Sequence, residues 1–237
     1  MRVELHEVGS VMHLMNRGAR GLPIVRDEAD RKNFLRSLFY LNDTHQDRNW
    51  RKTLRYTDFP KWPRTWPERN PLVDLWAWTL MPNHFHCIIR EKIKGGTAKF
   101  MQRFCGSLSA YANTKYNDKG SLFQGGYKGR VVGSDADLRW LASYVMVKNT
   151  LELYPGGLTR AIKKFNSAWE WGLNYPFSSM QHYGRDSFPS MMETEENMII
   201  SLFKNGKSFK GLSYDMLVHY TGTHKSDTRE ALTLEAK

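Results

Sequence analysis

Two apolar runs that meet at a Pro-Asn turn constrain the fold of this chain more than any other feature. Residues 72–81 are rich in leucine and tryptophan, and aromatic residues are typical of strands. Pro82-Asn83 follows, a dipeptide typical of tight turns. Residues 84–89, with the sequence His-Phe-His-Cys-Ile-Ile, form the second run. The pattern predicts a β-hairpin whose second strand begins with two histidines.

These two histidines are the first candidate functional residues. In an extended strand successive side chains point to opposite faces, so His84 and His86 share one face while Phe85 and Cys87 share the other. Two neutral imidazoles on one face can hold one metal ion. The same spacing also fits two partly exposed strand histidines that bind nothing, so the pair alone leaves both interpretations open.

The composition narrows the class of partner. The net charge is +11, from 35 Lys and Arg against 24 Asp and Glu, which favours a polyanion and most simply nucleic acid. No stretch approaches the roughly 20 apolar residues of a spanning helix, and the first residues lack a secretory signal. We expect a cytoplasmic protein with no membrane partner. Cys87 and Cys105 are too few for a disulfide framework or a thiolate metal site.

The order of expected elements indicates the fold class. Strands and helices alternate as βαββαβ, followed by one more helix, and this order is that of an α+β ferredoxin-like sandwich with an additional C-terminal helix that carries Tyr144. The expected elements are a strand over 10–16, a helix capped by Asp27, the hairpin, a helix capped by Thr97, a strand over 121–132 and a helix capped by Ser134 or Asp135.

We assign residues 1–157 to this domain and 158–237 to a C-terminal extension with a polar tail. Residues 44–71 interrupt the domain with aromatic rings among cations and prolines. Such a mixture suits stacking on unpaired bases beside phosphate contacts, and it equally suits a stiff loop whose tryptophans pack on the domain. The candidate DNA-binding residues of this insertion are Arg51, Lys52, Trp62 and Arg64. Other cations that would line a DNA groove, or form a solvated face, are Arg17, Arg20, Lys99, Arg103, Lys128 and Arg130.

Among eleven tyrosines, Tyr144 is distinguished by its place. It lies in the middle of an expected helix with Lys148 one turn later on the same face, although a core tyrosine would show the same pattern. Tyr111 and Tyr127 fit packing positions better. His13 belongs to the first strand, and we interpret it as a structural histidine whose hydrogen bonds are satisfied.

Several motifs occur in an order that resembles a known family. They are Asn16-Arg17-Gly18, Met81-Pro82-Asn83-His84-Phe85-His86, the run 120–128, the run from Leu138 through Tyr144 to Asn149, and Tyr175-Pro176-Phe177-Ser178-Ser179. Together they resemble the HUH single-tyrosine transposases of bacterial insertion sequences, and most closely the REP-associated tyrosine transposases. The resemblance covers about residues 8–183, broken by the insertion.

This resemblance implies an enzyme that nicks and rejoins single-stranded hairpin DNA in the cytoplasm, at the nucleoid. His84 and His86 would ligate a divalent metal, Mg²⁺ or Mn²⁺, and Tyr144 would form a 5′-phosphotyrosine. Members act as monomers or as dimers that exchange the tyrosine helix, so a homodimer is also compatible. A regulator that binds DNA without turnover, and a His-x-His metal phosphoesterase, are the alternatives.

The chain departs from the family pattern after the tyrosine. An amide side chain one turn later often completes the metal shell in this family, but here the fourth position is Lys148 and the fifth is Asn149. Either Asn149 turns in through a distorted helix end, or Lys148 contacts the phosphate or lowers the pKa of the phenol. We favour Asn149 as the third ligand. Thr150 stands where the family has proline, which leaves the helix boundary open.

Overall fold

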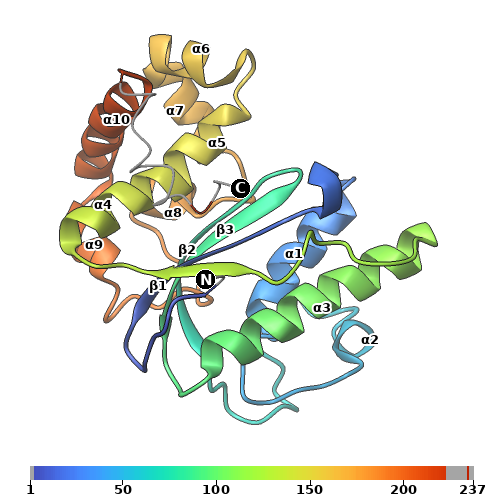
Figure 1. The fold of residues 1–237 in the computed structure, drawn as a ribbon. Coiled ribbons are helices and arrows are strands. Elements are labelled where there is room, and N and C mark those ends of the chain that lie inside the picture. Colours follow the sequence, from blue (N-terminus) through green and yellow to red (C-terminus); the bar gives the residue numbers. More distant parts are fainter. Residues whose placement is uncertain (1–2, 223–233, 235–237) are drawn as a thin grey trace.

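A four-stranded antiparallel sheet organises the protein (Figure 1). The computed structural model describes residues 3–222 and 234. The strand order is β2-β3-β1-β4, with β1 paired to both β3 and β4. This order confirms the predicted α+β, ferredoxin-like fold, and β2 and β3 form the predicted hairpin. The strands are β1 Val11–Arg17, β2 Val73–Leu80, β3 His84–Glu91 and β4 Lys128–Val131.

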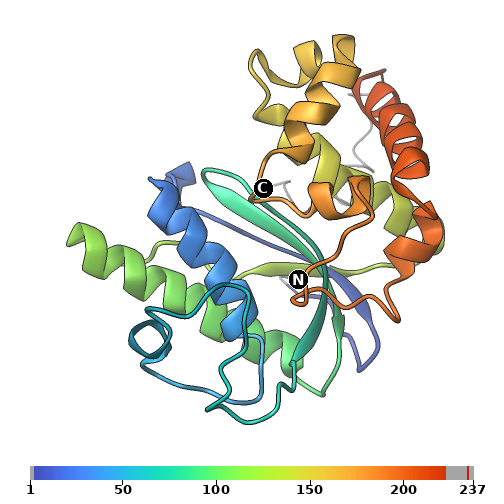
Figure 2. The same ribbon diagram turned by 180° about the vertical axis from the view of Figure 1, so that it is seen from behind.

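One face of the sheet is covered by α1 (Glu28–Tyr40) and α3 (Gly96–Tyr116) (Figures 1 and 2). Phe85 of β3 contacts Phe34 of α1 and Phe104 of α3, with ring centroids 5.6 and 5.2 Å away. Such edge-on and tilted ring contacts fill a core without polar atoms. This layer is therefore an ordinary apolar interior.

The predicted helix starts are correct in part. Asp27 caps α1, and Ser134 caps the next long helix, as expected. Thr97 does not cap α3, because Gly95 in a left-handed conformation (φ 73°) is the N-cap two residues earlier, and Thr97 N–H donates to Glu91 Oε2 (3.2 Å). The strand expected over 121–132 is also shorter, since only its last part pairs regularly with β1.

The opposite face carries the remaining long helical segment and the C-terminal region (Figures 1 and 2). α4 (Asp135–Ser143) continues directly into a π-helical turn, η2 (Tyr144–Lys148), and then into α5 (Asn149–Glu152). The elements that follow are α6 Gly157–Lys163, α7 Phe165–Leu173, α8 Met180–Gly184, α9 Met198–Phe203 and α10 Gly206–Gly222; a short turn, η1 Ala19–Gly21, and a short helix, α2 Trp50–Thr53, lie earlier in the chain.

Residues 177–183 cover the outer edge of β2. Leu80 N–H donates to Phe177 O (3.0 Å), Ser179 N–H donates to Trp78 O (2.9 Å), and Tyr183 Oη–H donates to Trp76 O (2.7 Å). These bonds satisfy an edge that would otherwise be open to a strand of another chain. The buried apolar side chains form one cluster that extends from the sheet into α7, α8 and α10. The boundary at residue 157 stays a sequence-based prediction.

Within residues 3–222 and 234, no helix is long and apolar enough to cross a membrane. The polar tail expected after Tyr220 lies almost entirely outside the described residues.

Candidate active site

Strand register places the histidines on the face opposite Phe85. His84 is paired with Arg17, and His86 with Met15, across the β1–β3 ladder. His13 of β1 is paired with Ile88 and so belongs to the same face, because directly paired residues of antiparallel strands share a side. Phe85 packs against α1 and α3 on the other side. The predicted sharing of one face by His84 and His86 therefore holds in the structure.

Hydrogen bonds orient both imidazoles. His84 Nδ1–H donates to Asn83 Oδ1 (2.7 Å), and because an amide oxygen only accepts, the neutral ring keeps its lone pair on Nε2. His86 Nδ1 shares a hydrogen bond of 2.9 Å with His13 Nε2. The His84 and His86 ring centroids are 5.0 Å apart, and all three histidines are buried.

The structure brings Tyr144 to these histidines. Its ring lies edge-on to His86, with centroids 5.8 Å apart, and stacks on Trp140 of α4 at 5.2 Å. Tyr144 is fully buried, and η2 packs against both β2 and β3. The candidate nucleophile and the candidate ligands thus belong to one site within one chain.

Because of the π-helical turn, the residue that lies one helical turn after Tyr144 is not the one an α-helix would place there. Asn149 N–H bonds to Tyr144 O, an i to i−5 bond in place of the i to i−4 bond of an α-helix. The turn therefore absorbs one extra residue, and Asn149 rather than Lys148 closes the turn that begins at Tyr144. A distorted helix of this kind is one of the two arrangements that the departure from the family pattern predicts. Thr150 does not end the helix, because it lies inside α5.

The side chain of Asn149 fits a role as a ligand. It is fully buried, yet neither its Oδ1 nor its Nδ2 has a hydrogen-bond partner in the part of the chain that the structure describes. An unsatisfied buried amide costs about 1–3 kcal/mol, so a native protein keeps one for a reason. Two imidazole nitrogens and an amide oxygen can together ligate one divalent cation, since imidazole suits transition metals and an amide oxygen suits harder ions such as Mn²⁺. The residues present therefore fit a divalent cation.

Lys148 is buried but has a charged partner. Its Nζ lies 2.7 Å from Glu152 Oε1 and 4.8 Å from the centre of the Tyr144 ring. Pairing with Glu152 offsets the cost of burying an ammonium group. The spacing of Lys148 and Glu152, four residues apart on a helix, is the sequence signal for this pair. Both roles considered for Lys148, phosphate contact and tuning of the phenol, stay predictions.

The cations predicted for a DNA groove are divided between the two sides of the sheet. Arg17, Lys128 and Arg130 share the histidine face by register, while Lys99 and Arg103 belong to α3 on the other layer. A single groove cannot hold them all. Arg20 is exposed on η1. Arg130 is buried in a two-bond ion pair with Asp137 (2.7 and 2.8 Å), which fastens β4 to α4, and Arg103 donates to Asp43 O (2.5 Å).

In the insertion, two of the candidate DNA-binding residues are half-buried and contact other parts of the protein. Arg51 donates to Asn33 Oδ1 (2.8 Å) and Ser107 O (2.9 Å), which ties the insertion to α1 and α3, and burial lowers its pKa to about 10. Trp62 donates to Pro67 O (2.8 Å) and stacks on Tyr40. Trp62 thus makes the packing contacts that the second interpretation predicts, and DNA binding by Arg51 and Trp62 stays a prediction. Lys52 and Arg64 are exposed.

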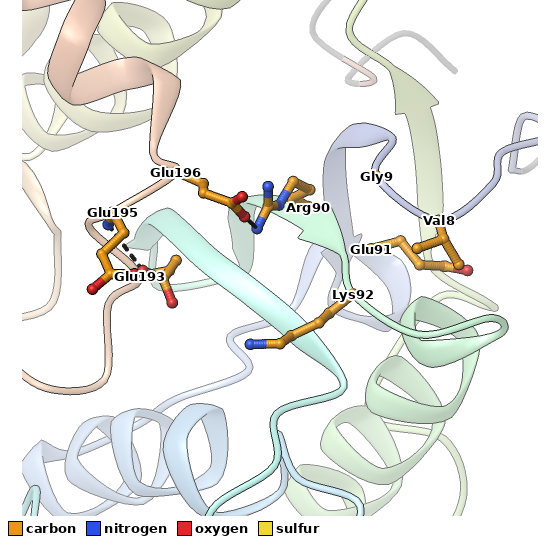
Figure 3. Close-up of a pocket in the computed structure, with 8 residues that line it drawn as sticks. All are labelled: Val8, Gly9, Arg90, Glu91, Lys92, Glu193, Glu195 and Glu196. Carbon is orange, nitrogen blue, oxygen red and sulfur yellow. Dashed lines mark hydrogen bonds and ion pairs between the residues drawn. The ribbon is translucent and has the colours of Figure 1, made fainter.

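A cavity of about 460 Å³ opens at the far end of β3 from the histidines (Figure 3). Arg90 extends toward Glu196 there and also pairs with Asp74 (2.6 Å). Because further carboxylates line this cavity beside Lys92, it does not present the net positive charge that a phosphate needs. Its lining residues are Val8, Gly9, Arg90, Glu91, Lys92, Glu193, Glu195 and Glu196.

A family model and a solved structure are similar to this chain. Residues 68–148 match the family model described as "Transposase IS200 like", a segment that holds His84, His86 and Tyr144 and ends one residue before Asn149. A solved structure described as "Structure of the REP associates tyrosine transposase bound to a REP hairpin" is 11% identical, with a TM-score of 0.42 over 82% of this chain and 94% of that one. No curated protein matches the chain. The family match bears out the resemblance seen in the motifs.

Proposed function

We propose, from the premise that residues 68–148 place this chain in the IS200-like transposase family, that it binds, nicks and rejoins single-stranded hairpin DNA. The observation that carries the proposal is the position of Tyr144 beside His86 in the same chain, with ring centroids 5.8 Å apart. At this separation the nucleophile and one metal ligand would act on the same phosphate group. The protein would act in the cytoplasm, at the nucleoid, where its substrate occurs.

The Tyr144 hydroxyl would attack the scissile phosphorus. The new bond joins the phenolic oxygen to phosphorus, the P–O3′ bond breaks, and the 3′ oxygen gains one proton, which balances the proton that the phenol loses, so that it leaves as a hydroxyl. The 5′-phosphotyrosine keeps the phosphodiester energy, so a second 3′ hydroxyl can reverse the step without a nucleotide cofactor. A free phenol ionises with a pKa of about 10, and the Lys148 ammonium over the Tyr144 ring would stabilise the phenolate.

His84, His86 and Asn149 would hold a divalent cation, Mg²⁺ or Mn²⁺. When bound, such an ion withdraws charge from a nonbridging phosphate oxygen and assists departure of the 3′ hydroxyl. Asn83 prepares His84 for this role by holding its proton on Nδ1. The π-helical turn supports this assignment over a regulator without turnover. It makes Asn149, and not Lys148, the residue that closes the turn beginning at Tyr144.

The phosphoesterase alternative has less support. Among the described residues, no group of three His, Cys, Asp or Glu side chains lies together as a metal centre independent of Tyr144 would require. A homodimer that exchanges the tyrosine helix is unnecessary for a complete site, since Tyr144 already contacts its own chain's His86. We therefore propose that one chain contains one working site.

The test is a covalent-adduct assay with labelled hairpin oligonucleotides and Mn²⁺. The protein should form a band that survives denaturing electrophoresis, and Tyr144→Phe should abolish it, whereas the matched control Tyr111→Phe on α3 should keep it. A band that persists in Tyr144→Phe would contradict the proposal. Mixing Tyr144→Phe with His86→Ala should not restore the adduct; restored activity would show an exchanged helix instead of a site within one chain.

A further inference from the structure

We propose that His13 is a positioning residue for His86: it accepts the Nδ1 proton of His86 and thereby leaves the Nε2 lone pair of His86 for a divalent cation. The inference rests on the metal site of the proposed function and extends it to a residue on another strand. His13 itself would not contact the ion or the DNA.

The geometry of the pair is well defined. His13 Nε2 and His86 Nδ1 are 2.9 Å apart, the rings lie nearly parallel (22°) with centroids at 5.1 Å, and both side chains are fully buried. The β1–β3 ladder sets this position, because His13 pairs with Ile88 and His86 with Met15, which makes the histidines diagonal neighbours on one face. Neither ring can turn away without breaking close packing.

The chemistry follows from the two ways in which a pair of neutral imidazoles can share one hydrogen bond. If His13 Nε2–H donates, His86 must carry its proton on Nε2, and that nitrogen has no lone pair for a metal. If His86 Nδ1–H donates, His86 Nε2 is a ligand and His13 carries its own proton on Nδ1. Only the second arrangement supports a metal site, so cation binding should select it.

The two ligand histidines therefore differ in how they are held. Asn83 offers His84 an amide oxygen, which can only accept. His13 offers His86 a nitrogen that can accept or donate, so the proton arrangement of His13 and the occupancy of the site are coupled. Partners of this kind orient metal-ligating histidines, and their loss typically weakens metal affinity by about 10- to 100-fold.

The test measures Mn²⁺ binding without DNA, by the electron paramagnetic resonance signal of free Mn²⁺. We expect His13→Leu to weaken binding by about 10- to 100-fold. His13→Gln should recover most of the loss, since its amide oxygen can accept the His86 proton. Met15→Leu is the matched control, because Met15 lies directly opposite His86 but shares no proton with it; it should bind as the wild type does. Circular dichroism verifies that each variant is folded.

A second measurement reads the proton directly. In ¹⁵N-histidine spectra of the Mg²⁺-loaded protein, His86 should show a protonated Nδ1, and His13→Leu should alter that signal while the His84 signal stays unchanged. Wild-type affinity in folded His13→Leu, no rescue by His13→Gln, or a wild-type protein that binds no Mn²⁺ would each overturn the inference. Tight Mn²⁺ binding with the expected variants but no covalent adduct would support the role of His13 and reject the proposed function instead.

Discussion

On one face of β3, Phe85 lies edge-on to Phe104 at 5.2 Å, and on the other face His86 lies edge-on to Tyr144 at 5.8 Å. Both pairs are fully buried, and both use the ring geometry that aromatic side chains prefer. The first pair contains only carbon and hydrogen. The second places ionisable and hydrogen-bonding groups in the same low-dielectric surroundings, where each needs a partner.

The difference shows what each side of the sheet does. The α1–α3 side gains stability from apolar burial at about 25 cal/mol per Å². On the histidine side, part of the stability from apolar burial is offset by the cost of burying polar groups. These include the unsatisfied Asn149 amide and the Lys148–Glu152 pair. Burial of polar groups at one place in a fold is typical of a functional site. The comparison yields three predictions.

The largest effect should come from the apolar side. Phe85→Ala should lower the free energy of unfolding by about 3–5 kcal/mol, because it leaves a cavity between Phe34 and Phe104. His84→Ala on the other side should cost only about 1 kcal/mol, the value of its hydrogen bond to Asn83. Urea unfolding followed by tryptophan fluorescence measures both. Equal losses would show that the two sides share the work of stabilisation.

A medium effect is expected at Asn149, where the substitution should increase the free energy of unfolding instead of lowering it. Asn149→Leu should raise the unfolding free energy of the metal-free protein by about 1–3 kcal/mol, since it removes an unsatisfied buried amide. The same variant should lose the thermal stabilisation that Mn²⁺ confers on the wild type.

The matched control for Asn149→Leu is Asn42→Leu. Asn42 is equally buried, but its amide bonds to Val73 O (2.7 Å) and Val73 N (3.0 Å). Its replacement should destabilise the protein, because both Val73 groups lose their partner. Thermal unfolding with and without Mn²⁺ compares the variants, and a destabilised Asn149→Leu would mean that its amide has a structural partner.

The smallest effect is a pH dependence confined to the α1–α3 side. The hydrogen bond from Lys115 lowers the pKa of Asp27 from 3.8 to about 2. Because the folded pKa lies below the unfolded one, the contribution to stability is complete above pH 4 and is lost as the pH falls toward 2. Thermal unfolding between pH 6 and pH 2 should show this loss, and Lys115→Met should flatten it. A Lys115→Met profile as steep as that of the wild type would contradict the assignment.

Much of the fold could be predicted from local sequence patterns. Period-two alternation separates His84 and His86 from Phe85, and the Pro82-Asn83 turn predicts the hairpin that the structure contains. The Asp27 cap could also be predicted, because capping depends on the residues of one helical turn. The exact ends of helices and strands were harder to predict. Gly95 ends the preceding loop through a left-handed backbone, so α3 begins ahead of the expected Thr97.

The site itself needed information from distant parts of the chain. The sequence alone predicted the histidine pair from residue spacing and a polyanionic partner from net charge, and it singled out Tyr144 through the resemblance of its motifs to a known family. Tertiary structure decided that His13 meets His86 across two strands, that Arg51 and Trp62 are half-buried against other segments, and that the predicted groove cations lie on different sides of the sheet. It also decided that Asn149, not Lys148, closes the turn after Tyr144. The physical reason is that strand register and a π-helical turn depend on packing between segments far apart in sequence, which local spacing does not encode.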